Sequence, residues 1–260
     1  MEVTMKNVQT ESVGSNFVIT LINPAKRNAL SLQVLHELIE AFEDAQKSDA
    51  LGIVLAAQGP VFSAGHNFAD MAGATREDAQ LLFQTCAKLM QLIQSVPQPV
   101  CASVHALATA AGCQLVATCD LAVAAESASF ALPGGKGGLF CHTPLVAVAR
   151  SISQKRAAEM AFTGDAISAQ TAHEWGLVNQ VVPDDELDDA VTEMLRRATR
   201  GSRWSRALGK RTFYEQITMS QVDAYEFASA IMADAAVGVD AQEGISAFLN
   251  KHDARFTQES

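Results

Sequence analysis

The chain has 260 residues, a length that suits one large domain or a core with a short appendage. Hydrophobic residues make up 48% and charged residues 18%, so the composition excludes a disordered chain. The net charge of -10 and the isoelectric point near 5.0 do not provide the positive field that nucleic-acid binding needs, and we expect no nucleic-acid partner.

The first two thirds of the chain alternate between short apolar runs and amphipathic helical patterns. Ser31 precedes a helix whose apolar residues share one stripe, and Pro97 and Pro99 end another helix. Such alternation is typical of an α/β core with mostly parallel strands. The predicted strands are 17–22, 51–57, 100–104 and 121–124, and the predicted helices follow Ser31 and cover 76–95 and 111–118.

From about Thr143 onward the pattern predicts helices only. Gly164 and Gly176 stand where helices commonly end in a left-handed residue. Asp240, with Glu243 three residues later, predicts a capping box for a last helix.

A short junction at 200–206 (RGSRWSR) separates two parts of the chain. Before it lies the alternating pattern, and after it only helices are predicted. We therefore expect a core domain, 1–200, and a C-terminal helical region, 201–260.

One uncharged stretch of twenty residues, 100–119, is long enough to require a membrane check. Polar residues interrupt it and alanine is more frequent than leucine, so a segment buried in a soluble core is the better interpretation, with no membrane partner. The opening residues, MEVTMKNVQTESVG, have no apolar region of a secretory signal. The five cysteines form no C-x-x-C pair and predict reduced thiols in a cytoplasmic protein.

Two segments combine small residues with the end of a predicted strand. They are 61–69 (VFSAGHNFA) and 105–120 (HALATAAGCQLVATCD), and their small side chains let backbone N–H groups approach a ligand oxygen. Taken singly, the first is explained as well by a surface loop and the second by tight helix packing. Together they predict two N–H donors that converge on one oxygen, as stabilisation of an enolate or a tetrahedral oxyanion requires.

A third glycine-rich segment, 133–138 (PGGKGG), invites comparison with a phosphate loop. A Walker motif needs a glycine where Phe130 stands and a serine or threonine where Gly137 stands. The sequence therefore argues against a nucleoside-triphosphate site here.

Several segments, spread nearly from end to end, resemble the enoyl-CoA hydratase (crotonase) superfamily. The resemblance implies an α/β fold, a spiral core of repeated ββα units with a C-terminal helical region that builds homotrimers or dimers of trimers. It also implies an acyl-CoA thioester as the bound partner, with coenzyme A entering as part of the substrate and no separate cofactor. The segments are NPAKRNALS (23–31), GPVFSAGHNF (59–68), PVCASVHALATAAGCQLVATCDLAVA (99–124), FTGDAISAQTAHEWGLVNQVV (162–182) and FLNKHDARF (248–256).

The same resemblance implies where the functional residues lie. The oxyanion hole would consist of the backbone N–H groups of His66 and Ala111, and family members usually have glycine at the second position. An alanine keeps the N–H donor, so the hole can persist. The implied contacts to the thioester and pantetheine are His66, Asn67, Phe68 and Ala69, those near the nucleotide are Lys26, Arg27 and Ala29, and those reaching coenzyme A from a neighbouring subunit are Phe248 and Lys251.

The chain departs from the family at the two glutamates that move protons in the well-known hydratases. Gln114 and Gly134 stand at the matching positions. A glutamine can bind a water but cannot take its proton at neutral pH, and a glycine has no side chain. Because a positioned acid or base contributes on the order of 10²–10⁴-fold in rate, ordinary hydration should be nearly abolished unless other groups replace them.

Few residues are candidates for replacement. His142 follows the GGKGGLFC loop and can face the pocket as an acid, a base or a proton shuttle. We expect Asp70 to be a solvated carboxylate and Asp120 to cap or brace the core. The histidines have no H-x-x-x-H or H-E-x-x-H spacing, so no metal site is predicted.

The default functional prediction is an enoyl-CoA hydratase, a lyase of fatty-acid and lipid metabolism. Decarboxylation, double-bond isomerisation and thioester hydrolysis are alternatives that use the same oxyanion hole. A non-catalytic acyl-CoA binder is a further alternative, because both glutamates are absent.

Overall fold

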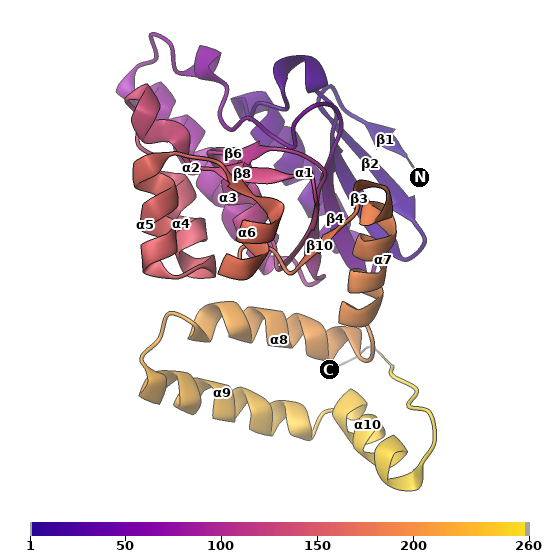
Figure 1. Ribbon diagram of the computed structural model, residues 1–260. Coiled ribbons are helices and arrows are strands. Elements are labelled where there is room, and N and C mark those ends of the chain that lie inside the picture. Colours follow the sequence, from indigo (N-terminus) through magenta and orange to yellow (C-terminus); the bar gives the residue numbers. More distant parts are fainter. Residues whose placement is uncertain (1, 258–260) are drawn as a thin grey trace.

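A seven-stranded sheet forms the centre of the computed structural model, which describes residues 2–257 (Figure 1). The first three strands pair antiparallel, and from β3 onward the pairing is parallel. The middle strands read as apolar runs because both faces of the sheet are covered. In sheet order the strands are β1 (Val3–Thr4), β2 (Val8–Val13), β3 (Asn16–Leu21), β4 (Gly52–Ala57), β5 (Val100–Val104), β7 (Leu121–Ala125) and β10 (Gln180–Val182).

A smaller sheet of three strands lies beside the first, in the order β6 (Ala108–Thr109), β8 (Ser129–Ala131) and β9 (Ile167–Ser168). The prediction of helices only beyond Thr143 is wrong, because β9 and β10 complete the two sheets. Both strands have two or three residues, too few for an alternating pattern to show in the sequence.

The helices of the core cover both faces of the large sheet. α1 (Leu32–Lys47) and α2 (Arg76–Ser95) pack on one face, and α7 (Leu187–Ala198) packs on the other against β5 and β7. Ser31 caps α1 and Thr75 forms a capping box with Asp78 at the start of α2. The remaining core helices are α3 (Ala111–Thr118), α4 (His142–Ser151), α5 (Gln154–Thr163) and α6 (Ala169–Trp175), with 3₁₀ turns at η1 (Pro24–Lys26), η2 (Phe68–Asp70), η3 (Pro133–Gly137) and η4 (Asp184–Glu186).

Gly164 and Gly176 follow α5 and α6 with φ values of 62° and 88°, which confirms their predicted roles as left-handed helix ends. The predicted capping box at Asp240 and Glu243 is wrong. The last helix begins after Gly238, and Asp240 is buried, where it accepts hydrogen bonds from the Ser202 hydroxyl and the Thr257 amide. The Asp240 carboxylate therefore binds residues that are distant in the sequence, and the pattern of its neighbours does not reveal these contacts.

Three helices form a separate layer below the core (Figure 1). They are α8 (Arg203–Gln216), α9 (Gln221–Ala236) and α10 (Val239–Asn250). The junction predicted at 200–206 follows the end of α7 and contains a left-handed Gly201 and the start of α8. The division of the chain into two domains at residue 200 stays a prediction.

The uncharged stretch at 100–119 folds as β5, β6 and α3, all inside the core. Among residues 2–257, no helix is both long enough and apolar enough to cross a membrane.

Asp120 joins the helical layer to the core. It lies just before β7 and accepts hydrogen bonds from the Val100 amide at 2.7 Å and from the Tyr214 hydroxyl at 2.8 Å. Lys210 of α8 reaches the same carboxylate at 2.6 Å, and its ammonium also donates to the carbonyls of Ile93 and Gln98. Burial lowers the pKa of Lys210, while Asp120 partly offsets that shift. The expectation that Asp120 braces the core is thus met by its contacts.

Removal of the Lys210 cation should leave Asp120 partly buried without its counter-charge. The side chains of Lys210 and Asp120 are 10% and 16% exposed, so we expect Lys210→Met to lower the free energy of unfolding by about 3 kcal/mol. The matched control is Lys136→Met, which breaks the 57% and 73% exposed pair with Asp165 and should cost less than about 1 kcal/mol. Urea unfolding curves measure both, and equal losses would contradict the anchoring role of Asp120.

Candidate active site

Two segments far apart in the sequence run side by side in the core. The Phe62 amide donates to the Leu107 carbonyl at 2.9 Å, and the Thr109 amide donates to the Ser63 carbonyl at 3.0 Å. These bonds align the loop after β4 with the turn before α3 in a short parallel bridge. The two donor segments predicted from the sequence are therefore neighbours in space.

Two glycines allow the close approach of these segments. A Cβ atom added to Gly112 would lie 2.4 Å from the Ser63 carbonyl oxygen. A Cβ atom on Gly65, whose φ is +84°, would lie 2.9 Å from the Cβ of Ala110 and 3.1 Å from the Ala111 nitrogen. Backbone atoms cannot yield to such contacts, so only glycine fits at either position.

The amides of His66 and Ala111 are free at this junction. Within the described part of the chain, neither N–H group donates a hydrogen bond, and both residues line the same cavity. Ala111 is the first residue of α3, so its N–H group also carries the partial positive charge of a helix N-terminus. The structure thus brings the two predicted donors to one cavity.

Ala110 adopts a strained conformation immediately before the second donor. Its φ of 51° and ψ of −118° lie in a region that residues with a side chain rarely occupy, at a cost on the order of 1–3 kcal/mol. A 2.9 Å hydrogen bond from its amide to the Ala131 carbonyl holds it there. This turn ends the bridge to Ser63 and begins α3 at Ala111, which leaves the Ala111 amide without a helical partner.

The cavity beside the donors has a volume of about 310 Å³ and a mainly apolar wall. Its ionisable side chains are those of His66, Cys141 and His142. Burial raises the pKa of the Cys141 thiol, so this group stays protonated and is a poor nucleophile. Residues that line the cavity are Ala64, His66, Phe68, Met71, Phe83, Thr109, Ala110, Ala111, Pro133, Gly134, Gly137, Leu139, Phe140, Cys141, His142, Thr143 and Pro144.

The imidazole of His66 is a neutral acceptor in the cavity wall. Its Nδ1 lies 3.3 Å from the Leu30 carbonyl, which can only accept, so Nδ1 carries the proton. Burial lowers the pKa of His66 and keeps the ring uncharged. The Nε2 atom is buried and has no hydrogen-bond partner among residues 2–257, and the ring of Phe83 lies edge-on at 5.2 Å.

His142 has the opposite environment. It begins α4, is exposed to solvent and lines the cavity, and its ring lies 5.3 Å from that of Phe140. An exposed imidazole can exchange protons with water. The structure therefore places His142 where a proton carrier for this cavity could stand.

Neither position that matches a family glutamate can present a side chain to the cavity. Gln114 is buried in α3 and does not line the cavity. Its side-chain amide oxygen lies 3.9 Å from the sulfur of Cys86. Gly134 lines the cavity, but a Cβ atom there would lie 2.2 Å from the Leu139 carbonyl oxygen. The turn at residues 134–139 therefore leaves no room for a side chain at position 134. A glutamate could not stand there without a change in the path of the backbone.

The residues expected to contact coenzyme A form a second cluster. Lys26, Ala29 and Asn67 line one cavity of about 220 Å³. Arg27, in a left-handed conformation, is exposed beside them. Phe68 is 77% exposed and lines the cavity beside the donors, whereas Ala69 is exposed and lines none of the described cavities.

The expectation that Asp70 is a solvated carboxylate is wrong. Its carboxylate accepts hydrogen bonds from the Leu32 amide and the Asn67 side chain, both at 2.9 Å. It thereby caps the first turn of α1 and fixes the segment that follows His66.

Phe248 and Lys251 lie on the last helix, away from both clusters of the same chain. Phe248 is 84% exposed, and Lys251 ends α10 in a left-handed conformation. Their predicted contact with coenzyme A across a subunit boundary stays a prediction.

The sequence did not reveal several side chains of the cavity wall, including Met71, Phe83 and Phe140. Phe83 stands next to the buried stripe of α2 that contains Leu82 and Cys86. Its only sequence signal is an aromatic residue at the edge of an apolar face, which occurs in many helices.

Comparison with known proteins identifies relatives over almost the whole chain. The pattern that describes the family Enoyl-CoA hydratase/isomerase matches residues 11–259. A rat protein, "Enoyl-CoA hydratase domain-containing protein 3, mitochondrial", is 47% identical over 235 residues, which cover 90% of this chain and 78% of that protein.

Two crystal structures share the fold. An enoyl-CoA hydratase of Mycobacterium smegmatis is 42% identical with a TM-score of 0.93, covering 96% of this chain and 99% of its own. The human enoyl coenzyme A hydratase domain-containing protein 3 is 43% identical with a TM-score of 0.93, covering 96% and 100%. The predicted crotonase-like α/β fold is confirmed.

The prediction of a cytoplasmic protein is overturned by these relatives. The rat, mouse and human proteins are all named mitochondrial. The prediction rested on unpaired cysteines, which do not distinguish one compartment with reduced thiols from another.

A side chain at position 112 should separate the two donor segments. We expect Gly112→Ala to lower the free energy of unfolding by about 1–3 kcal/mol, because its Cβ meets the Ser63 backbone, and to weaken acyl-CoA binding as the donors move apart. The control is Gly209→Ala in α8, outside the cavity, where an added Cβ meets open space within the described chain; it should not lower stability and should leave acyl-CoA binding unchanged. Denaturant unfolding and calorimetric titration measure the two effects. A Gly112→Ala protein with unchanged stability and binding would contradict the close approach.

Proposed function

The chain belongs to the enoyl-CoA hydratase/isomerase family, whose members act on acyl-CoA thioesters, and we propose that it stabilises a thioester enolate with the backbone amides of His66 and Ala111. The observation that carries the proposal is the pair of unpaired N–H groups on one apolar cavity. Negative charge grows on the thioester oxygen when an enolate forms. Fixed donors in a site of low polarity stabilise that charge, and one such donor contributes on the order of 10²–10³-fold in rate.

Hydration of a 2-enoyl-CoA is the reaction that we assign first. The oxygen of water bonds to the β-carbon and gives one proton to a proton carrier, while the electrons of the double bond shift through the α-carbon and place negative charge on the thioester oxygen. The carrier then returns a proton to the α-carbon as the enolate re-forms the carbonyl, so no proton is gained or lost overall. His142 is the proposed proton carrier, because it lines the cavity and is open to solvent. The buried, neutral ring of His66 is less suited to exchange with water.

Isomerisation of a 3-enoyl-CoA is the second candidate. One group can take the proton from the α-carbon and return it to the γ-carbon, so a single carrier suffices. Gln114, whose side chain points away from the cavity into the core, and the crowded turn at Gly134 favour this candidate, since neither position supplies a carboxylate for a second proton transfer. Decarboxylation, thioester hydrolysis and binding without turnover are distinguished by the same assay.

We also propose that Lys26, Arg27 and Ala29 lie along the coenzyme A nucleotide. The proposal is supported by the cavity that Lys26 and Ala29 share with Asn67, and by the affinity of a cation for phosphate in a chain of net charge -10. Asn67, Phe68 and Ala69 would then follow the pantetheine arm between this cavity and the donors.

A panel of thioesters tests the reaction. Purified protein is incubated with 2-enoyl-, 3-enoyl- and malonyl-CoA esters, and products are identified by mass spectrometry. We expect turnover of a 2-enoyl or 3-enoyl ester that falls about 10²-fold or more in His142→Gln. The control is His36→Gln, on the exposed face of α1, which should keep full activity.

The outcomes separate the alternatives. Full activity of His142→Gln would remove His142 as the proton carrier but leave the oxyanion hole intact. Calorimetric binding of acyl-CoA with no product from any ester would replace the enzyme with a binding protein.

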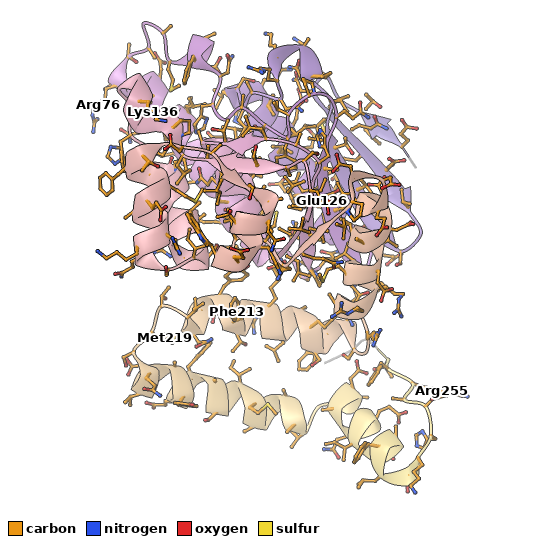
Figure 2. All side chains as sticks on the ribbon, viewed as in Figure 1. Arg76, Glu126, Lys136, Phe213, Met219 and Arg255 are labelled. Carbon is orange, nitrogen blue, oxygen red and sulfur yellow. The ribbon has the colours of Figure 1, made fainter. Side chains whose placement is uncertain are left out.

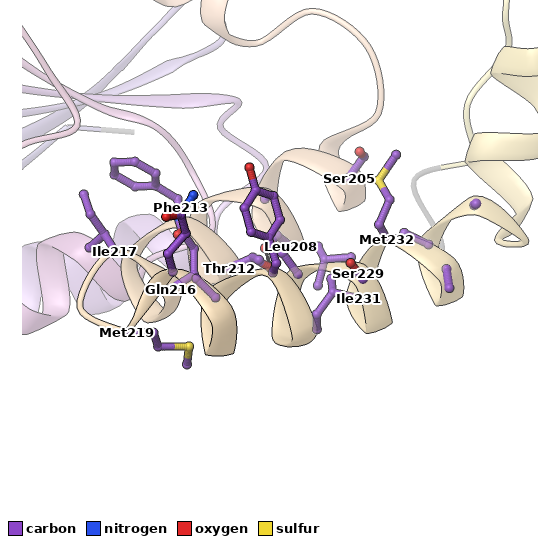
Figure 3. Close-up of a pocket in the computed structure, with 18 residues that line it drawn as sticks. Ser205, Leu208, Thr212, Phe213, Gln216, Ile217, Met219, Ser229, Ile231 and Met232 are labelled. Atoms are coloured by element: carbon purple, nitrogen blue, oxygen red, sulfur yellow. Dashed lines mark hydrogen bonds between the residues drawn. The ribbon is translucent and has the colours of Figure 1, made fainter.

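We propose a homotrimer or a dimer of trimers built through the helical layer. Every residue of α9 is at least partly exposed, although the helix carries large apolar side chains. Figure 3 shows the groove between α8 and α9, with Leu208 of α8 and Ile217 just after it on one side and Ile231 and Met232 of α9 on the other. Phe213 lines this groove and also a second cavity between α8 and the core (Figure 2). Apolar surface of this kind on a monomer is typical of an interface.

A charge on this surface should weaken the assembly. Met232 of α9 is 71% exposed, and we expect Met232→Lys to shift the mass from three or six chains towards one. Light scattering coupled to gel filtration measures the mass. Val13→Lys, at an exposed apolar residue of β2, is the control, and a monomeric parent protein would exclude the proposed assembly.

A further inference from the structure

The cavity beside the two donors has no formal charge in its wall. Among the described residues that line it, none is Asp, Glu, Lys or Arg. Its large apolar side chains are three aromatic rings, a methionine and a leucine, from Phe68, Phe83, Phe140, Met71 and Leu139. The polar side chains are two threonines, two histidines and the protonated thiol of Cys141.

The charges nearest in the chain are engaged elsewhere. Lys136 stands between Gly134 and Gly137 of the wall, but its ammonium pairs with Asp165 at 2.6 Å. The Asp70 carboxylate is occupied by the Leu32 amide and the Asn67 side chain. His66 is kept uncharged by burial, and His142 lies exposed to water, which screens any charge it carries.

From this wall we infer that the site takes an acyl group with an uncharged hydrocarbon chain and rejects acyl groups that carry a distal carboxylate. The inference rests on the proposed function, because it assigns the cavity to the acyl group. Each methylene group moved from water into an apolar site strengthens binding by about fourfold. A carboxylate in the same place loses its water without gaining a cation, which weakens binding.

Met71 offers a way to reverse this preference. It is half-buried, lines the cavity and belongs to the turn after His66. Lysine has a similar unbranched length, so Met71→Lys adds a cation to the wall with little change of shape. Met71→Leu changes the side chain without adding a charge and is the matched control.

Calorimetric titration of the 260-residue protein with acetyl-, butyryl-, hexanoyl- and adipoyl-CoA tests the inference. We expect the affinity of the parent protein to rise by about fourfold per methylene group from acetyl to hexanoyl, until the cavity is filled. Adipoyl-CoA, which has six carbons and a terminal carboxylate, should bind at least about tenfold more weakly than hexanoyl-CoA. Met71→Lys should reduce the ratio of the hexanoyl-CoA affinity to the adipoyl-CoA affinity, or reverse it. Met71→Leu should leave this ratio unchanged.

Two failures are distinguishable. If adipoyl-CoA binds the parent protein within about threefold of hexanoyl-CoA, the inferred preference is wrong although the proposed function stands. If neither coenzyme A nor any of the four esters binds, the assignment of the cavity to an acyl-CoA is wrong, and the inference falls with it.

Discussion

The close contact between the loop after β4 and the turn before α3 is the constraint on which the candidate site depends. Gly112 lets α3 lie against the Ser63 carbonyl, and Gly65 lets the loop pass the Ala111 nitrogen. Any side chain at either position would push the two segments apart. Because they touch, the amides of His66 and Ala111 reach the same cavity without a partner in the described chain. Strain at Ala110 is part of the same arrangement.

A site made of backbone donors tolerates changes that a site of side chains does not. The N–H group of Ala111 is unaffected by the extra methyl group relative to glycine. The side chains that would complete an acid–base pair depend on direction as well as identity, and Gln114 points into the core while Gly134 is enclosed by the turn at Leu139. On the proposed function, the polarisation of a thioester and the movement of protons would therefore be separable in this protein.

The helical layer is attached to the core by a few specific contacts. Asp120 accepts hydrogen bonds from β5 and from two residues of α8, and the buried Asp240 joins the end of the chain to Ser202. These polar anchors leave the apolar surface of α9 available for a neighbour. The cavity proposed for the acyl group lies in the core instead, so the proposed assembly and the proposed substrate preference would use different surfaces.

Much of this protein is determined by the sequence alone, because short-range patterns act locally. Ser31 and Thr75 cap their helices through neighbours three residues away, and the apolar runs of β4 and β5 identify buried parallel strands. The small residues of 61–69 and 105–120 likewise indicate two backbone donors. Only the tertiary structure decided which groups surround those donors. Phe83 of α2 lines the cavity, the Asp70 carboxylate binds the first amide of α1, and β10 pairs with β7. Each of these contacts joins residues that are distant in the sequence. Local patterns do not specify such contacts, because they depend on how the packed elements meet.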